Sequence, residues 1–256
     1  MSRLDRDGVG IHYEVHGSGP VILLSHGYSA TAEMWRGQIA SLTQRHTLVT
    51  WDMRGHGQSD APADLAAYSA DHTVVDMAAL LDTVGAKSAI VGGLSLGGYM
   101  ALAFHHAHPD RVRALVLCST GPGFRRDDAR EAWNKRAMQT ATEWETEGLD
   151  RLQRLSKEAA TATHRSADGL ARAARGMLSQ RDGSIIETLP EIAVPTLIVV
   201  GANDTPFLAA SDYMAAKIPG AHKVVIPAAG HSCNIDQPEI FNREVVAFLD
   251  RRASNA

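Results

Sequence analysis

A serine flanked by glycines, in the segment Gly93-Leu94-Ser95-Leu96-Gly97-Gly98, constrains the fold of this chain more than any other feature. The apolar run Ala89–Val91 precedes it, and the helical pattern Tyr99–Phe104 follows it. We therefore expect a buried strand, a tight turn with Ser95 at its apex, and a helix. Such a turn holds the hydroxyl out of the sheet at the helix N-terminus, where it is suited to attack a carbonyl carbon. A glycine-rich connector with an incidental serine is the alternative.

Apolar runs alternate with helical patterns on both sides of this turn. The expected buried strands are Val21–Leu24, Thr47–Trp51, Ala89–Val91 and Ala114–Cys118. The expected helices are Met34–Leu42, Ser69–Val84 and Leu96–His106. Strand alternating with helix predicts an α/β fold, with a mostly parallel twisted sheet and helices on both faces. Ile11–Val15 alternates in polarity before the turn residues Gly17–Pro20, which predicts an antiparallel hairpin at the sheet edge.

The alternation is interrupted by about sixty-five residues without a convincing strand, from Arg125 to Leu189. It resumes with a strand at Thr196–Val200, a helix at Leu208–Ile218, a strand at Lys223–Ile226 and a helix at Pro238–Arg252. We therefore expect a core formed by residues 1–123 and 190–256, and an inserted helical cap at 124–189. Because ligands bind at the carboxyl ends of parallel strands, we interpret the insertion as a lid, with a distant stabilising decoration as the alternative.

Composition excludes several classes of protein. A hydrophobic content of 45% and a net charge of −4 indicate a soluble globular chain and no attraction to nucleic acid or anionic membrane. No apolar run reaches membrane-spanning length and no signal pattern opens the chain, so with only two cysteines we expect a reduced, cytoplasmic setting. His105, His106 and His108 lie near a helix end without a cysteine or carboxylate cluster, so we interpret them as solvated and expect no metal site.

A serine nucleophile needs a base and a carboxylate that orients the base. His231 follows the last expected strand, and Asp204 follows the strand before it. The order Ser95, Asp204, His231 predicts a catalytic triad that meets at the carboxyl edge of the sheet. No carboxylate follows the strand ending at Cys118, and Asp236 is expected to cap the final helix rather than orient His231.

An acyl-transfer site also needs hydrogen-bond donors for the oxyanion. We expect the backbone N–H groups of Leu96, directly after the nucleophile, and of Tyr28, in the loop after Leu24, to supply them. Gly27 would let the backbone of this loop come close. His26 is a candidate substrate contact, but a hydrogen bond that anchors the loop is favoured for its side chain.

Other candidate substrate contacts come from the expected cap and from residues near the triad. Arg125 and Arg126, at the cap entry, could hold a carboxylate, although a solvated basic turn is the favoured interpretation. Trp133 and Trp144 are expected to pack the cap more than to stack on substrate. The candidate contacts are Phe124, Trp133, Trp144, Phe207 and Cys233.

Taken together, these residues resemble the α/β-hydrolase superfamily, specifically single-domain serine hydrolases with a helical cap. The resemblance rests on His26-Gly27, the loop Asp52–Ser59, the turn around Ser95, Gly201–Asp204 and Gly230-His231. It implies the fold given above, a serine hydrolase without a cofactor, and a bracing role for the loop Asp52–Ser59. Ser95 separates the chain from haloalkane dehalogenases and epoxide hydrolases, which place an aspartate at this position.

The leading functional hypothesis is hydrolysis of a small carboxylic ester or lactone through an acyl-enzyme. Hydrolysis of a C–C bond in a ring-cleavage product, or of an enol-lactone, is the alternative, although the tryptophan that often follows the catalytic histidine of C–C hydrolases is replaced by Ser232. Perhydrolysis is a possible side activity. A small-molecule binding protein on a hydrolase scaffold is the non-enzyme alternative. We expect a small-molecule partner and a monomer or homodimer.

Overall fold

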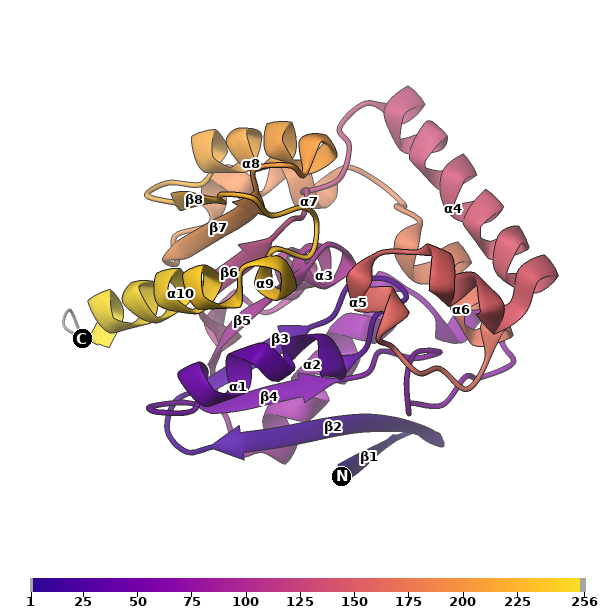
Figure 1. The fold of residues 1–256 in the computed structure, drawn as a ribbon, viewed down its shortest axis with the longest axis horizontal. Helices are drawn as coiled ribbons and strands as arrows, with labels where there is room; N and C mark the ends of the chain where they lie inside the picture. Colours follow the sequence, from indigo (N-terminus) through magenta and orange to yellow (C-terminus); the bar gives the residue numbers. More distant parts are fainter. Residues whose placement is uncertain (1, 254–256) are drawn as a thin grey trace.

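The computed structural model describes residues 2–253 and confirms the expected α/β fold (Figure 1). Eight strands form one sheet in the order β1-β2-β4-β3-β5-β6-β7-β8. The pairs β1–β2 and β2–β4 are antiparallel, and the strands from β4 to β8 are parallel. The strands are β1 Ser2–Arg6, β2 Val9–Gly17, β3 Val21–Ser25, β4 Thr47–Trp51, β5 Ala89–Leu94, β6 Val112–Cys118, β7 Thr196–Gly201 and β8 His222–Ile226.

The expected hairpin at the sheet edge is wrong in its pairing. Strand β2 is antiparallel, as expected, but β4 lies between it and β3, so Gly17–Pro20 joins two strands that are not neighbours. The hairpin partner of β2 is β1, whose polar sequence Ser2–Arg6 gives no strand signal. Its backbone pairs with residues 9–13 although most of its side chains are exposed or half-buried.

Helices cover both faces of the sheet because its side chains alternate between them. Leu23 packs in the cluster that holds Met77 of α2 (Ala70–Thr83) and Phe104 of α3 (Leu96–Ala107). Its neighbours Ile22 and Leu24 point to the opposite cluster, which contains Phe241. That second face is covered by α1 (Arg36–Leu42) and α10 (Pro238–Ala253), while α8 (Thr205–Lys217) contributes Met214 to the first.

Helix starts follow local chemistry. The Ser69 hydroxyl accepts a hydrogen bond from the His72 N–H at 3.0 Å and so caps α2. The remaining short helices of the core are η1 Ala32–Trp35, η2 Leu65–Ala67, η3 Pro109–Arg111 and α9 Cys233–Asp236.

His105 is buried in α3, which corrects the expectation that it is solvated. Its neighbour His106 is exposed. Within residues 2–253, none of the helices is long and apolar enough to cross a membrane.

The stretch between β6 and β7 is helical, and α4, α5 and α6 lie together beside the sheet (Figure 1). Trp144, which has no exposed surface, packs with Ala141, Leu170 and Ala174 in a small core of its own. This helical insertion contacts the loops that follow β3 and β4, through Tyr28 to Leu170 and Gly57 to His164. Its elements are α4 Asp127–Glu147, η4 Gly148–Arg154, α5 Lys157–Ala160, α6 Ala167–Ala173, the π-helix η5 Ala174–Leu178, α7 Ser184–Glu187 and η6 Leu189–Glu191.

Candidate active site

Ser95 occupies the strained turn that the sequence predicts between β5 and α3. Its φ of 54° and ψ of −114° place it in a region that costs a non-glycine residue about 1–3 kcal/mol. Surrounding hydrogen bonds hold this backbone: the Ser95 N–H donates to the Cys118 carbonyl at 2.9 Å, and the Thr120 hydroxyl donates to the Ser95 carbonyl at 2.6 Å. A Cβ at Gly97 would lie 2.2 Å from the Ser25 carbonyl oxygen, so the turn can close only with glycine there.

Asp204 and His231 meet at the carboxyl ends of β7 and β8. The His231 Nδ1 lies 2.9 Å from the Asp204 Oδ2, and the aspartate is buried while the imidazole is partly exposed. Since an ionised carboxylate only accepts, Nδ1 carries the proton and Nε2 is free to act as a base. The two loops approach closely because Gly201 has no side chain: a Cβ there would lie 2.1 Å from the Gly230 carbonyl oxygen.

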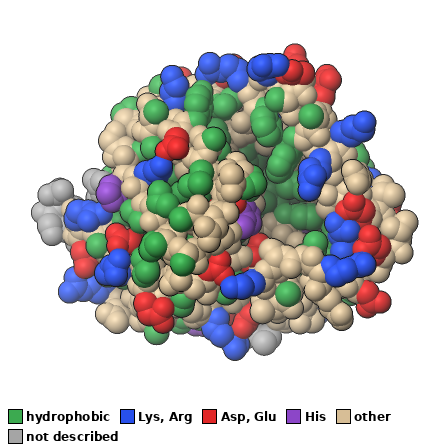
Figure 2. Space-filling view, turned by 45° about the horizontal axis from the view of Figure 1, so that its top comes forward, with side chains coloured by type: hydrophobic (Ala, Val, Ile, Leu, Met, Phe, Trp, Pro, Cys, Tyr) green, Lys and Arg blue, Asp and Glu red, His purple; other side chains and the backbone are tan. Residues whose placement is uncertain are grey.

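Ser95 lines a cavity of about 310 Å³. Phe207, which also lines it, packs against the His231 imidazole with 4.8 Å between ring centroids. The structure thus joins Asp204 to His231 by a hydrogen bond, and links His231 to the Ser95 cavity through Phe207. The lining residues are mainly apolar: Leu96, Tyr99, Pro122, Phe124, Trp133, Leu178, Pro206, Phe207 and Ala210, with Ser95, Thr120, Gly121, Gly123 and Gln180. Figure 2 shows a hollow walled largely by hydrophobic side chains.

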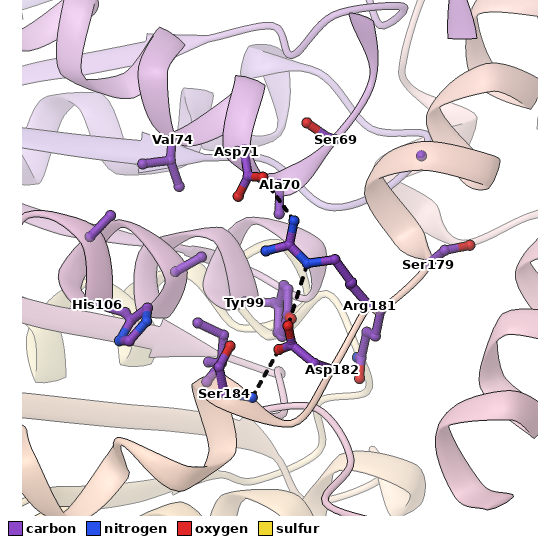
Figure 3. A pocket seen from close by; sticks show the side chains of 15 residues that line it. Ser69, Ala70, Asp71, Val74, Tyr99, His106, Ser179, Arg181, Asp182 and Ser184 are labelled. Atoms are coloured by element: carbon purple, nitrogen blue, oxygen red, sulfur yellow. Dashed lines mark hydrogen bonds and ion pairs between the residues drawn. The ribbon is translucent and has the colours of Figure 1, made fainter. Parts of the chain in front are cut away.

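A second cavity, of about 500 Å³, shares Tyr99 and Gln180 with the first but does not include Ser95. In Figure 3 the Arg181 guanidinium lies between two carboxylates. It is 3.1 Å from the Asp71 Oδ2 and 3.4 Å from the Asp182 Oδ2. This cavity is the larger of the two, but its charged groups already pair with one another, and neither Ser95 nor the Asp204–His231 pair lines it.

The loop after β3 lies directly against Ser95. A Cβ at Gly27 would be 3.7 Å from the Ser95 Cβ, so the backbone of the Tyr28 loop borders the serine. Leu96, the first residue of α3, has a backbone N–H without an intrahelical acceptor. Tyr28 thus follows a residue that borders Ser95, and Leu96 follows Ser95 directly; the role of their N–H groups as oxyanion donors stays a prediction.

Three expected substrate contacts lie outside the cavity. His26 is fully buried, with its Nδ1 2.6 Å from the Gly27 carbonyl oxygen and its Nε2 accepting the Met53 N–H at 2.9 Å, so it anchors the loop. Trp144 fills the core of the helical insertion. Cys233 is buried near the Ser119 hydroxyl, and burial raises the pKa of its thiol to about 12. Phe124, Trp133 and Phe207 do line the cavity.

Asp236 is the last residue of α9 and does not directly precede the final helix, which begins at Pro238, contrary to the expectation that it caps that helix. Its Oδ2 accepts the Gly230 N–H at 2.8 Å, and its carboxylate pairs with Lys157 of the helical insertion. Arg126 pairs with Asp128 on the exposed surface, and neither Arg125 nor Arg126 lines the cavity. Among the described residues, no group of three or more histidine, cysteine or acidic side chains could hold a metal ion.

Sequence reasoning missed several residues of this cavity. Tyr99 lies one helical turn after Ser95 on α3, a spacing that places it on the same side and could have identified it. Leu178 and Gln180 come from the end of the helical insertion, and no local pattern marks them. Trp133 positions Leu178, because its Nε1 donates to the Leu178 carbonyl at 2.7 Å.

Comparison with known proteins places the chain in a family. A family model described as alpha/beta hydrolase fold matches residues 20–147. The chain belongs to the α/β-hydrolase fold family. It is 28% identical to a putative 2-succinyl-6-hydroxy-2,4-cyclohexadiene-1-carboxylate synthase from Bacillus subtilis (strain 168), covering 94% of this chain and 95% of that one. A 3-oxoadipate enol-lactonase from Acinetobacter baylyi is 27% identical, covering 97% and 96%.

Solved structures agree with this family membership. A thermophilic esterase from Thermogutta terrifontis superposes with a TM-score of 0.83, at 28% identity and over 98% of this α/β hydrolase and 99% of the esterase. The similarity spans almost the whole of both chains. It therefore includes the helical insertion as well as the sheet.

Proposed function

We propose that this α/β hydrolase cleaves a small carboxylic ester or lactone through an acyl-enzyme formed on Ser95. The observation that carries the proposal is the hydrogen-bonded pair Asp204–His231, placed through Phe207 beside the cavity into which the strained Ser95 turn opens. A buried carboxylate, an imidazole oriented by it and a serine on a strand-to-helix turn are the components of nucleophilic acyl transfer.

In the proposed reaction, His231 Nε2 takes the proton of Ser95 as its Oγ attacks the substrate carbonyl carbon. The oxyanion that forms accepts hydrogen bonds from the N–H groups of Tyr28 and Leu96. The tetrahedral intermediate collapses as His231 returns the proton to the leaving alcohol, and Ser95 is left acylated. Water, deprotonated by His231, then attacks the acyl carbonyl, and this intermediate collapses as His231 returns the proton to the Ser95 Oγ and the acid is released. Asp204 holds the imidazole tautomer and stabilises the imidazolium throughout.

The cavity suggests that the group held next to Ser95 is uncharged. None of the described residues that line it is charged, and nine of them are apolar or aromatic. A carboxylate moved into such a site would lose its hydration without gaining a cation. This contrasts with the acids named for the synthase and the enol-lactonase that the chain resembles. We therefore favour a neutral aliphatic or aromatic ester or lactone over a substrate that bears a carboxylate.

We also propose that residues 124–189 act as a cap over this site. Phe124, Trp133, Leu178 and Gln180 from this stretch line the cavity together with Ser95, Leu96 and Phe207 of the core. Enol-lactone hydrolysis uses the same chemistry and remains the alternative reaction within this proposal.

The proposal is tested by labelling with a fluorophosphonate and by assay on p-nitrophenyl butyrate. We expect one label per chain and turnover of the ester, with both lost in Ser95→Ala by at least about 10³-fold. Esterase activity that persists in Ser95→Ala would contradict the proposal. A burst of p-nitrophenol without turnover would instead favour a binding protein on a hydrolase scaffold.

A further inference from the structure

Residues 157–164 of the helical insertion, here called the bridging segment, contact two loops that the proposed reaction uses. One end meets the loop that carries His231, and the other meets the loop that carries Tyr28. The side chains of Glu158 and His164 are only 3% and 6% exposed. Burying ionisable groups costs free energy unless they are hydrogen-bonded, so their partners indicate what the segment holds in place.

His164 uses both ring nitrogens, in opposite roles. Its Nδ1 accepts the Gly57 N–H at 2.9 Å, and its Nε2 lies 3.0 Å from the Ser29 carbonyl oxygen. A ring nitrogen that accepts from an N–H carries no proton, so the proton is on Nε2, which donates to Ser29. Only the neutral Nε2–H tautomer of His164 makes both hydrogen bonds.

The Ser29 carbonyl belongs to a strained residue directly after Tyr28. Ser29 has a φ of 59°, a conformation that a non-glycine residue keeps only where its surroundings hold it. Its hydroxyl donates to the Tyr28 carbonyl at 2.6 Å, and the Tyr28 hydroxyl donates to the Leu170 carbonyl at 2.8 Å. The insertion therefore holds the Tyr28–Ser29 backbone from two sides, through His164 and through Leu170.

The other end of the bridging segment holds the His231 loop on both sides of the histidine. The buried Glu158 carboxylate accepts a hydrogen bond from the hydroxyl of Ser232, the residue after His231. Lys157 pairs with Asp236, whose Oδ2 accepts the N–H of Gly230, the residue before His231. Two adjacent residues of α5 thus reach the two neighbours of one imidazole.

We propose that the bridging segment fixes the His231 loop relative to the Tyr28 loop, with His164 and Glu158 as positioning residues for the hydrolysis. The proposal rests on the proposed function, because it assigns the Tyr28 N–H and His231 their roles. His164 would act through Ser29 on the direction of the Tyr28 N–H. Glu158 would act through Ser232 on the direction of the imidazole.

The first test compares His164→Leu with His164→Gln on p-nitrophenyl butyrate, with kcat expressed per site titrated by a fluorophosphonate. Leucine fills the space without hydrogen bonds, so kcat should fall about tenfold while KM changes less than about twofold. Glutamine offers one acceptor and one donor and should restore most of kcat. His105→Leu, which removes a similarly buried histidine from α3, is the matched control and should leave kcat unchanged.

Two outcomes would overturn the role of His164. One is an unchanged kcat per titrated site in His164→Leu. The other is an equal loss in His164→Gln and His164→Leu, which would assign His164 to packing alone. In the same assay Glu158→Gln should retain activity and Glu158→Leu should lose it about tenfold, and equal activities would overturn the role of Glu158. Activity that survives in Ser95→Ala would count against the proposed function instead, so the two failures are distinguishable.

A second test uses the wild-type chain and does not depend on folding of a variant. Burial, the largest cause, lowers the pKa of His164 below its ordinary value of 6.5, against the Ser29 carbonyl and the charge of Asp52. The other titratable groups that face it are His56, with 5.8 Å between ring centroids, and His26, whose pKa burial lowers to about 4. ¹⁵N NMR of the histidine rings should show the neutral Nε2–H tautomer for His164 at pH 7, and a protonated or Nδ1–H ring would overturn the proposal.

Protonation of His164 also predicts how stability and kcat depend on pH. A histidine whose pKa is lowered in the folded state contributes stability that is complete above pH 6.5 and is lost as the pH falls towards the folded value. Protonation of His164 would also remove its acceptor for the Gly57 N–H. The kcat of the wild type should therefore fall more steeply below pH 6.5 than that of His164→Gln, and parallel profiles would contradict this.

Discussion

The two cavities that share Tyr99 and Gln180 differ in size and in charge. The smaller one contains Ser95 and no charged lining residue among those described. The larger one contains Arg181 paired with Asp71 and Asp182 (Figure 3). Cavity volume alone therefore does not identify a reactive site. The proposed function assigns the reaction to the smaller cavity, because a strained serine and an oriented imidazole lie at its apolar wall, whereas the charges at the larger cavity pair with one another.

The largest expected effect separates the carboxylates of the two regions. Asp204→Asn should lower kcat for p-nitrophenyl butyrate by about 10³–10⁴-fold, because an amide does not hold the imidazole in the required tautomer. Asp182→Asn, the same change in the larger cavity, should leave kcat within about twofold, since its partner Arg181 is exposed. Steady-state kinetics on the two purified variants measures both kcat values. Comparable losses of kcat in both would show that the carboxylate at the larger cavity matters as much as Asp204.

The next effect concerns substrate charge. The kcat/KM for p-nitrophenyl butyrate should exceed that for p-nitrophenyl hydrogen succinate by about 100-fold, because the succinate carboxylate would be desolvated against apolar side chains. Leu178→Arg, which adds a cation to the wall, should narrow this ratio about tenfold. Ser184→Arg, which adds the same cation to the larger cavity, is the control and should not change it. Equal kcat/KM values of the wild type for both esters would contradict the proposal that the site takes an uncharged group.

Trp133 gives an intermediate effect on the wall of the smaller cavity. Its ring packs 5.8 Å from Phe124, and its Nε1 donates to the Leu178 carbonyl. Trp133→Ala should raise KM for p-nitrophenyl butyrate roughly tenfold through lost apolar contact, with a smaller change in kcat. Trp133→Phe keeps a ring but not the N–H, so its KM should lie between those of the wild type and Trp133→Ala. A KM that is the same in all three proteins would remove Trp133 from the substrate site.

The smallest effect belongs to the ion pair in the larger cavity. Arg181 and Asp71 side chains are 78% and 70% exposed, and such pairs contribute about 0–1 kcal/mol. Arg181→Ala should shift the thermal midpoint by no more than a few degrees and leave kcat/KM within about twofold. Differential scanning calorimetry and the ester assay measure the two quantities. A large loss of activity would show that the larger cavity takes part in the reaction.

Much of the fold could be predicted from the sequence because parallel strands are buried on both faces. Continuous apolar runs such as Thr47–Trp51 and Thr196–Val200 stand out for that reason, and residues that follow them meet at one edge of the sheet. Asp204 follows such a run, and His231 follows the shorter apolar run Val224–Ile226 of the edge strand β8, so their positions along the chain predict that they pair. The pairing of β2 could not be predicted, because sequence proximity to β3 favours a hairpin while the sheet places β4 between them.

The contribution of the helical insertion to the candidate site could largely not be predicted from the sequence. Trp133 and Trp144 lie on the same helix, yet one reaches the cavity and the other fills the insertion's own core, and only the packing of α4 against α6 decides which. Glu158 and His164 look like ordinary polar residues of a helical region. Their burial comes from docking against loops more than sixty residues away in the chain, which leaves no trace in local periodicity.

The place of the insertion between β6 and β7 has a consequence for biosynthesis. Val116 and Leu117 of β6 pair with Leu197 and Ile198 of β7, which leave the ribosome only after the whole insertion has been made. Until then one side of β6 is an unpaired apolar edge, the kind of surface on which nascent chains aggregate. Slow translation across the insertion would prolong that exposure. The yield of folded protein should therefore depend most on chaperones when translation pauses before Thr196.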